Sequence, residues 1–211
     1  MEKTRRKARN SARSAPPAPV RERVLNAAFS AFVEKGYNAT STLEIASRAK
    51  VSKRELYQIC ADKTGLLRQA IAERAGRMRL PLEVPAATDR KTLATTLRSF
   101  GTATLKGLSD PAVRGVFRLV ISESVEDPEV ARALKGGRDQ GRIALARTLA
   151  QAQADGLIGQ GEPDEMARDF LALLVGDLMI QMLLRLIDPP GPQAIEQRAH
   201  AATEKFLQLH S

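Results

Sequence analysis

The sequence predicts an all-α fold of about nine helices in a chain of 211 residues. Apolar residues recur at steps of three and four along nearly the whole chain, as they do on the buried face of a helix. No segment shows the alternation of apolar and polar residues that is typical of a half-buried strand. Proline at first helical positions and glycine after last ones separate the periodic segments. These three observations predict helices throughout.

The chain starts with a segment that lacks this helical pattern. Residues 1–19 are rich in Arg, Ser, Ala and Pro and show no apolar period, which predicts a disordered basic arm. A first helix follows from Val20, and Gly36 is a natural stop for it.

The segment 41–57 carries two short helical patterns joined by a tight turn. Each begins with the sequence of a capping box, because Ser41 is followed three residues later by Glu44 and Ser52 by Glu55. Two short helices joined in this way are typical of a helix-turn-helix, whose second helix lies in the DNA major groove. With the first helix, they predict an N-terminal three-helix DNA-binding unit.

Six further helices are expected after this motif, as a connecting helix and a C-terminal helical bundle. Their starts are marked by acidic caps, by proline or by a new apolar period. They begin near Asp62, Leu93, Pro111, Pro128, Pro163 and Ile195, and residues 84–89 form a linker.

The helix that begins at Pro163 is expected to continue through residue 187. Its residues 170–187 are apolar on nearly every side. Asp177, Gln181 and Arg185 are spaced four apart and share one face. This polar stripe predicts a buried helix rather than a membrane span.

The formal net charge of +9 is distributed unevenly. Residues 1–79 hold 18 Lys and Arg against 7 Asp and Glu, whereas residues 80–211 hold 15 against 17. This asymmetry is typical of a nucleic-acid-binding end joined to an electrostatically ordinary body. The cations of the N-terminal arm could contact phosphates, although a solvated tail is the commoner behaviour of such a segment.

The N-terminal region contains the stretches AFVEKGYNAT, STLEIASRAKVSKRELYQI and DKTGLL. Together, these stretches resemble the TetR family of transcriptional regulators. The resemblance implies DNA contacts near the start of the helix-turn-helix and on its second helix. Hydroxyl groups and cations at helix N-termini suit phosphate oxygens. The residues implied are Thr40, Ser41, Thr42, Ser52, Lys53, Tyr57 and Lys63.

Base reading is expected from Lys53, Arg54 and Gln58. Arg54 could form a bidentate pair with guanine and Gln58 with adenine, each contributing roughly 1–3 kcal/mol of discrimination. A phosphate contact is an equal alternative for Arg54. Glu55 could accept a hydrogen bond from cytosine, but its capping role is favoured.

The sequence departs from the family pattern at several positions. Lys50 stands where the family usually has glycine, which costs on the order of 1 kcal/mol if the backbone there is left-handed. Arg54 and Glu55 replace small residues, and Cys60 replaces an aromatic. Cys60 is the only cysteine, so no intramolecular disulfide or four-cysteine zinc site forms. A small buried side chain is favoured over a redox-sensing thiol.

The resemblance also implies a homodimer, held by the last two helices of each subunit. A two-fold interface would hold two helix-turn-helix units at a fixed spacing. Packing within one chain is the alternative for these apolar residues. The predicted interface residues are Phe170, Leu174, Leu178, Ile195, Ala199, Ala202, Phe206 and Leu209.

The family further implies a pocket for a small-molecule effector between the helices of the body. Internal hydrogen bonds or ion pairs are an equal explanation for Asp177 and Arg185. The predicted pocket residues are Phe100, Phe117, Arg118, Ile121, Ser122, Glu123, Asp177 and Gln181. The chain therefore divides into the arm 1–19, a helix-turn-helix DNA-binding domain 20–66, and a ligand-sensing and dimerisation domain 67–211.

Two other classes of protein fit less well. His200 and His210 have no nearby nucleophile, and no phosphate-binding glycine loop or metal-ligand spacing occurs, so we expect no enzyme, cofactor or metal. The basic arm suits a DNA-packing protein, but the near-neutral body does not. We predict a cytoplasmic transcriptional regulator, without membrane contact, that binds a palindromic operator as a homodimer and responds as a repressor to an unidentified small molecule.

Overall fold

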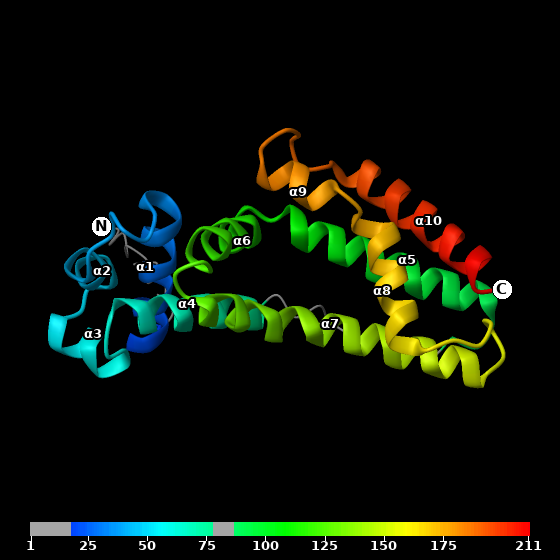
Figure 1. Ribbon diagram of the computed structural model, residues 1–211, viewed down its shortest axis with the longest axis horizontal. Helices are drawn as coiled ribbons and strands as arrows, with labels where there is room; N and C mark the ends of the chain where they lie inside the picture. The colour runs from blue at the N-terminus through cyan, green and yellow to red at the C-terminus, as the bar shows by residue number, and fades with distance from the viewer. Residues whose placement is uncertain (1–17, 78–86) are drawn as a thin grey trace, which may run out of the picture.

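The computed structural model describes residues 18–77 and 87–211, which fold into helices without a strand. The all-α prediction is confirmed (Figure 1). The predicted arm, up to residue 17, and part of the predicted linker lie outside the described residues. The helices are α1 (Val20–Lys35), α2 (Thr42–Ala49), α3 (Lys53–Ile59), α4 (Lys63–Arg77), α5 (Arg90–Ser109), α6 (Pro111–Glu123), α7 (Pro128–Ala154), α8 (Pro163–Val175), α9 (Leu178–Leu183) and α10 (Pro192–Leu209).

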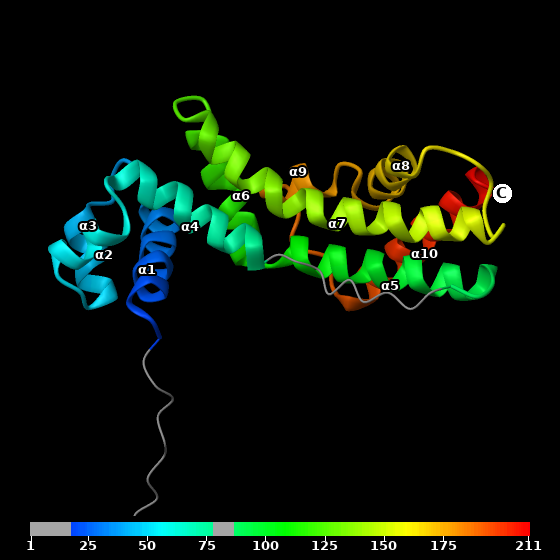
Figure 2. The same cartoon turned by 90° about the horizontal axis from the view of Figure 1, so that it is seen from below.

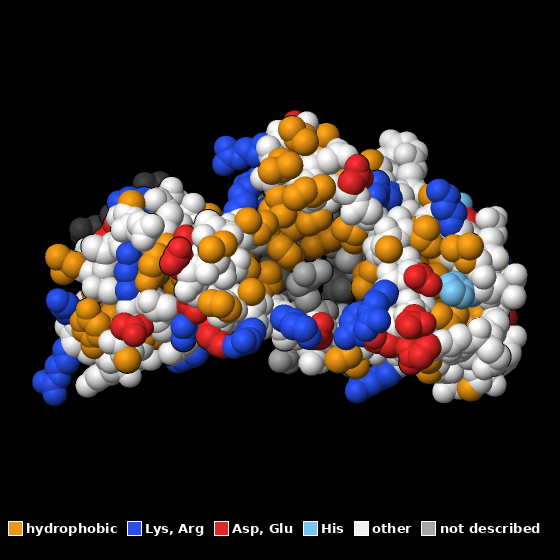
Figure 3. Space-filling model, in the orientation of Figure 1, with side chains coloured by type: hydrophobic (Ala, Val, Ile, Leu, Met, Phe, Trp, Pro, Cys, Tyr) orange, Lys and Arg blue, Asp and Glu red, His pale blue; other side chains and the backbone are white. Residues whose placement is uncertain are grey.

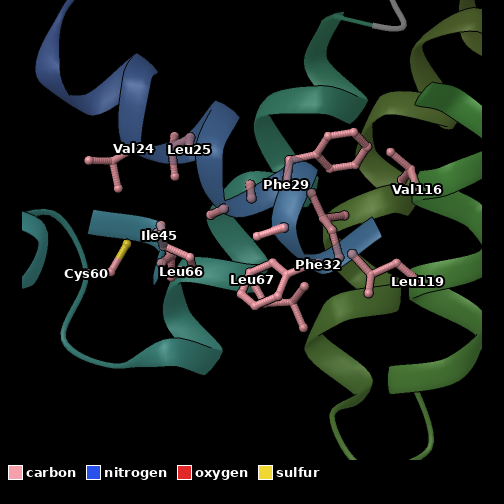
Figure 4. Close-up of a cluster of buried hydrophobic side chains, with 14 of the residues drawn as sticks. Val24, Leu25, Phe29, Phe32, Ile45, Cys60, Leu66, Leu67, Val116 and Leu119 are labelled. Carbon is pink, nitrogen blue, oxygen red and sulfur yellow. The ribbon is translucent and has the colours of Figure 1, made fainter. Parts of the chain in front are cut away.

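A first hydrophobic core joins α1–α4 to the body. Phe32, Ile45 and Leu66 are fully buried in it. Val116 and Leu119 of α6 belong to the same core and point toward α1 (Figure 4). The helix-turn-helix unit therefore rests directly on α6 and on the start of α7. The predicted domain boundary between residues 66 and 67 lies inside α4, whose buried residues on both sides share this core.

A second core holds the far end of the molecule together. It is formed by α5, the second half of α7, α8, α9 and α10. Phe170 lies at its centre, with its ring centroid 6.2 Å from that of Phe100 and 5.5 Å from that of Phe206. The result is an elongated molecule with α2 and α3 at one end and the α5–α10 body at the other (Figures 1 and 2).

The helix expected to run from residue 163 through 187 is instead two helices, α8 and α9, and this part of the prediction is wrong. The break falls at Gly176, which has a φ of 48° that L side chains rarely adopt. Arg198 of α10 donates hydrogen bonds to the carbonyl oxygens of Leu174 (2.6 Å) and Val175 (2.8 Å). This guanidinium binds the last carbonyl groups of α8 and so ends the helix.

The break also changes the predicted polar stripe. Asp177 precedes α9 and accepts a hydrogen bond from Gln181, whereas Arg185 follows α9 with a left-handed φ of 60°. Within residues 18–77 and 87–211, no helix is long and apolar enough to cross a membrane.

Candidate nucleic-acid interface

The two helices of the predicted helix-turn-helix begin differently. Ser52 and Glu55 form the full capping box: the serine hydroxyl accepts from the Glu55 amide, and the Ser52 amide donates to the Glu55 carboxylate at 2.7 Å. At α2 only half of the box forms, with the Ser41 hydroxyl accepting from the Glu44 amide.

Glu44 is drawn away from its predicted capping role by two cations. Its carboxylate lies 2.7 Å from the Lys35 ammonium of α1 and 2.7 Å from the Arg48 guanidinium one turn ahead on α2. Lys35, whose hydrogen bond is the largest cause, and Arg48 lower the pKa of the Glu44 carboxyl group. The interaction ties α2 to α1 instead of capping α2.

The turn between α2 and α3 is built on a left-handed residue. Lys50 has φ 55° and ψ 51°. The next amide, that of Val51, donates to the Ala46 carbonyl at 3.0 Å, and the Lys50 amide donates to the Ser47 carbonyl at 3.1 Å. These two bonds are the pattern of a Schellman motif, in which glycine is the usual left-handed residue.

α3 presents one polar face to solvent, while Leu56 and the half-buried Ile59 anchor it to the first core. Leu56 is fully buried in the first core. The remaining polar residues of the helix and its cap are exposed, and Lys and Arg side chains project from this end of the molecule (Figure 3). The exposed predicted residues are Ser52, Lys53, Arg54, Tyr57 and Gln58.

The start of α2 and the middle of α3 meet on this exposed face. The Thr42 hydroxyl lies 3.4 Å from the Tyr57 hydroxyl, and the Lys53 ammonium lies 5.8 Å from the centroid of the Tyr57 ring. Ser41 is exposed beside Thr42. The structure therefore brings hydroxyl groups from the α2 N-terminus next to the cations of α3, as phosphate binding requires.

Lys63 and Thr40 also have structural roles in the α1–α2 loop. The Lys63 ammonium donates to the Asn38 carbonyl at 3.4 Å and lies 4.2 Å from the centroid of the Tyr37 ring. Thr40 is 2% exposed, and its hydroxyl lies 2.8 Å from the Gly36 carbonyl oxygen and 3.1 Å from that of Ala31. The Thr40 hydroxyl is therefore buried and bonded within the protein, so among the three hydroxyl residues predicted at the start of α2 the exposed Ser41 and its neighbour Thr42 suit a DNA contact better.

Cys60 is buried at the end of α3. Burial raises the pKa of its thiol, so the reactive thiolate is disfavoured. This environment suits the predicted packing role.

The predicted dimer residues lie mostly inside one chain. Leu209 is 68% exposed, whereas the other seven are buried in the second core. They pack intramolecularly, which was the alternative explanation of their apolar character, and they offer no side-chain surface to a partner. The buried residues are Phe170, Leu174, Leu178, Ile195, Ala199, Ala202 and Phe206.

The predicted pocket residues are not brought together as one set. Phe100 belongs to the second core and Phe117 packs against the first. The Ser122 hydroxyl bonds to its own helix and to Glu123, and Gln181 donates to Asp177. Arg118 and Ile121, by contrast, lie one turn apart on α6, and the Arg118 guanidinium binds the end of α9.

Two recesses occur elsewhere on the body. A surface groove of about 710 Å³ lies between α5 and α10, and none of the predicted residues lines it. A second hollow, with hydrophobic side chains along its rim, lies between α9 and α7 (Figure 3). Residues lining the groove are Arg98, Ser99, Thr102, Ala103, Lys106, Glu196, Gln197 and His200.

Comparison with known protein families agrees with this geometry. The family model of the bacterial TetR regulatory proteins matches residues 24–70, the segment that folds as α1–α4. A model of the C-terminal domain of AefR-like transcriptional repressors matches residues 95–210, more than half of the chain. The chain belongs to the TetR family. The resemblance seen in the three N-terminal stretches is confirmed, and the protein is a TetR-family transcriptional regulator of the DNA-binding type.

Individual TetR-family relatives extend the likeness over nearly the full length. The uncharacterized HTH-type transcriptional regulator YvkB of Bacillus subtilis is 27% identical over 191 residues, which is 84% of this chain and 92% of YvkB. A TetR transcriptional regulator from Agrobacterium tumefaciens is 27% identical, with a TM-score of 0.79 over 92% of this chain and 94% of that chain. The flavonoid-responsive regulator FrrA is 28% identical, with a TM-score of 0.75 over 91% of this chain and 97% of that chain.

Proposed function

We propose that this TetR-family regulator is a ligand-responsive repressor that acts in the cytoplasm and binds a palindromic operator as a homodimer. The observation that carries the proposal is the exposed polar face of α3, held rigid by a buried leucine and a complete capping box. A short helix fixed in this way can enter the major groove without reorganising.

The exposed side chains of the helix-turn-helix suit two kinds of DNA contact, with phosphates and with base edges. Thr42, Lys53 and Tyr57 lie together and suit phosphate oxygens, which sets the position of α3 on the duplex. Ser41 and Lys63 extend this phosphate-binding set. Arg54 and Gln58 are exposed without such neighbours and suit base edges.

Dimerisation is assigned to the outward faces of α8 and α10. With the larger apolar side chains turned inward, these faces include the small side chains of Ala172 on α8 and Ala194 and Ala201 on α10, and Leu209 is exposed at the end of α10. Small residues let two helices approach closely, so the same faces of a second copy can pack on them. The two copies of α3 would then lie about one turn of DNA, roughly 34 Å, apart.

Ligand response is assigned to the contact between α6 and the DNA-binding unit. Val116 and Leu119 of α6 share a core with α1, so a molecule that shifts α6 changes the position of α3. A ligand that favours the wrong spacing of the two recognition helices would release DNA by population shift. FrrA, a flavonoid-responsive protein of the same fold, supports this assignment.

The proposal is tested by sedimentation velocity and footprinting with genomic fragments. We expect a dimer and a short protected palindrome, and Arg54→Ala should need a higher protein concentration to protect it. Arg147→Gln, an exposed substitution on α7, should leave the footprint unchanged. A monomer, or uniform coating of all fragments as by a DNA-packing protein, would contradict the proposal.

A further inference from the structure

Three arginines gather where α6 meets the end of α9. Arg114 and Arg118 are one turn apart on α6, and Arg185 lies just after Leu184, the C-cap residue of α9. Arg118 donates hydrogen bonds to the carbonyl oxygens of Met182 and Leu183, each at 3.0 Å. Its guanidinium therefore binds the C-terminal end of α9, where the helix dipole is negative.

The arginine cluster brings three positive charges close together. Burial lowers the pKa of Arg118, and the neighbouring charges of Arg185 and Arg114 lower it further. Among the described residues, no carboxylate pairs with any of the three guanidinium groups, and the Arg114 Nε is buried without a hydrogen-bond partner. Three like charges held together are unfavourable unless a counter-ion joins them.

Exposed aliphatic side chains surround the cluster. Ile121 lies one turn beyond Arg118 on α6 and is 56% exposed. Leu184 and Leu186 flank Arg185 and are 61% and 69% exposed. Figure 3 shows hydrophobic side chains gathered over α9, next to Lys and Arg side chains and above the hollow between α9 and α7.

Three arginines beside exposed aliphatic side chains favour one kind of ligand. An uncharged molecule or an apolar protein face would bury the guanidinium groups without pairing them, which is costly. DNA phosphates could pair them, but α3 lies at one end of the molecule, whereas α9 lies near the middle of its length on the other side of α6 (Figure 1). A molecule that carries both an anionic group and an apolar chain satisfies the arginines and covers the aliphatic side chains together.

We infer that the arginine cluster and its aliphatic surroundings bind a small amphipathic anion. The carboxylate, sulfonate or phosphate group lies between Arg114 and Arg185, and the apolar chain lies over Ile121 and Leu184. A charge-assisted bidentate contact of this kind is the usual use of arginine in anion recognition.

The site also connects to the DNA-binding unit, and this half of the inference rests on the proposed ligand response. Gly115 of α6 lies against α1 so closely that a Cβ there would lie 3.1 Å from the Val33 side chain. An anion that draws the arginines of α6 toward α9 therefore moves the surface on which α1 packs. Binding at the cluster would change operator affinity without touching α3.

Calorimetric titration of the full chain with decanoate and with 1-decanol tests the site. The two probes have the same chain length and differ in charge. We expect decanoate to bind more tightly, and Arg114→Gln and Arg185→Gln each to weaken it by about tenfold or more, since each removes a charged hydrogen-bond donor. Arg147→Gln should bind decanoate like the unchanged protein, and thermal denaturation of each variant confirms that it folds.

The possible results separate the site from the proposed function. Equal affinities for decanoate and decanol, no binding of octanoate, decanoate or dodecanoate, or no effect of the two arginine substitutions would overturn the inference. Operator binding by the unchanged protein is measured independently. If decanoate binds as expected but leaves operator affinity unchanged, the anion site stands and the ligand-response part of the proposed function fails.

Discussion

At the scale of single residues, Lys50 stands out because it holds a backbone conformation that disfavours its side chain. Its φ of 55° is required by the two hydrogen bonds that close the turn between α2 and α3. A left-handed conformation costs an L residue roughly 1–2 kcal/mol, and glycine avoids this cost. The turn that holds Lys50 lies at the end of the molecule where Lys and Arg side chains gather (Figures 1 and 3).

Replacing Lys50 by glycine should therefore stabilise the protein. Glycine removes the strain but loses more entropy on folding, so we expect a net gain of about 0.5–1 kcal/mol and a rise in Tm of roughly 1–4 °C. Ser47→Gly, at an exposed helical position of α2, is the matched control and should lower Tm. Thermal denaturation measures both, and an unchanged or lower Tm for Lys50→Gly would show that the turn is not strained.

Arg54 and Lys63 should affect DNA binding differently. Arg54→Ala removes a base contact and is expected to cost about 1–3 kcal/mol on the operator, with a smaller loss on random DNA. Lys63→Gln removes a phosphate contact while keeping a donor for the Asn38 carbonyl. Lys63→Gln should weaken binding to all DNA sequences alike and reduce the salt dependence of binding by about one released counterion. Equal losses of Arg54→Ala on operator and random DNA would refute the base-reading role.

Residue types and their spacing were enough to predict the exposed face of α3. They did not predict every hydrogen-bond and ion-pair partner of the residues in the motif. The Ser41 box is half formed because Lys35 of α1 and Arg48 compete for Glu44. Lys35 lies outside the local motif, so its competition depends on how α1 packs against α2. Thr40 shows the same limit, since its hydroxyl bonds to α1 rather than facing solvent.

At the scale of helices, α3 depends on its capping box and so on the ionisation of Glu55. The backbone amide of Ser52, and then its hydroxyl, lower the pKa of the Glu55 carboxyl group below its ordinary value of 4.5. A lowered pKa means that the ionised form stabilises the folded state above the unfolded pKa. This contribution is lost as the pH falls through the folded pKa, below about 4.5.

Glu55→Gln should therefore lower Tm at neutral pH, and the difference from the unchanged protein should shrink as the pH falls through the lowered pKa of the Glu55 carboxyl group, because the protonated side chain is uncharged like that of glutamine. Glu126→Gln, an exposed change in the α6–α7 turn, should have little effect at neutral or acidic pH. The measurement is thermal denaturation across this pH range. A Tm difference that stays constant down to the lowest pH would exclude the ionised cap as its cause.

The break between α8 and α9 shows why helix boundaries are harder to predict than helix identity. Apolar periodicity continues on both sides of Gly176, so the sequence pattern alone favours one long helix. The carbonyl groups at the break are satisfied by Arg198, a residue of another helix. Local periodicity contains no information about that contact.

Arg198→Met should consequently destabilise the body. The side chain keeps its apolar stem but leaves the carbonyl groups of Leu174 and Val175 without their partner, which costs about 1–3 kcal/mol. Arg168→Met on α8 is the control, because it removes only an exposed ion pair with Asp164, worth about 0–1 kcal/mol. Urea denaturation compares the two, and equal losses would mean that the capping contact adds no stability.

At the scale of the whole molecule, the two hydrophobic cores divide the chain at a different place from the sequence motifs. The sequence located the DNA-binding helices and predicted a helical body, because these follow from local pattern. It did not show that α6 and the start of α7 share a core with α1–α4, since this depends on contacts distant in sequence. That shared core is what connects any event in the body to α3.

An ion pair crosses this connection between α4 and α7. Arg68 of α4 binds Asp127 in bidentate fashion, with Nε–Oδ2 and Nη2–Oδ1 both at 2.7 Å. Asp127 also caps α7 by accepting from the Glu129 amide. The pair fixes the DNA-binding unit against the body, so it helps to set the spacing of the two recognition helices in a dimer.

Breaking this pair should weaken operator binding without unfolding α3. Asp127→Asn keeps the cap of α7 but loses the charge, and Arg68→Gln removes the charged partner of Asp127. Each substitution is expected to lower operator affinity by about threefold to tenfold. The two residues act as one unit, with a coupling energy of at least about 0.5 kcal/mol. The double variant should then be no worse than either single one. Arg132→Gln, which removes an exposed pair within α7, is the control. Quantitative operator titrations of the four variants decide the matter, since independent, additive losses would show that Arg68 and Asp127 do not act together.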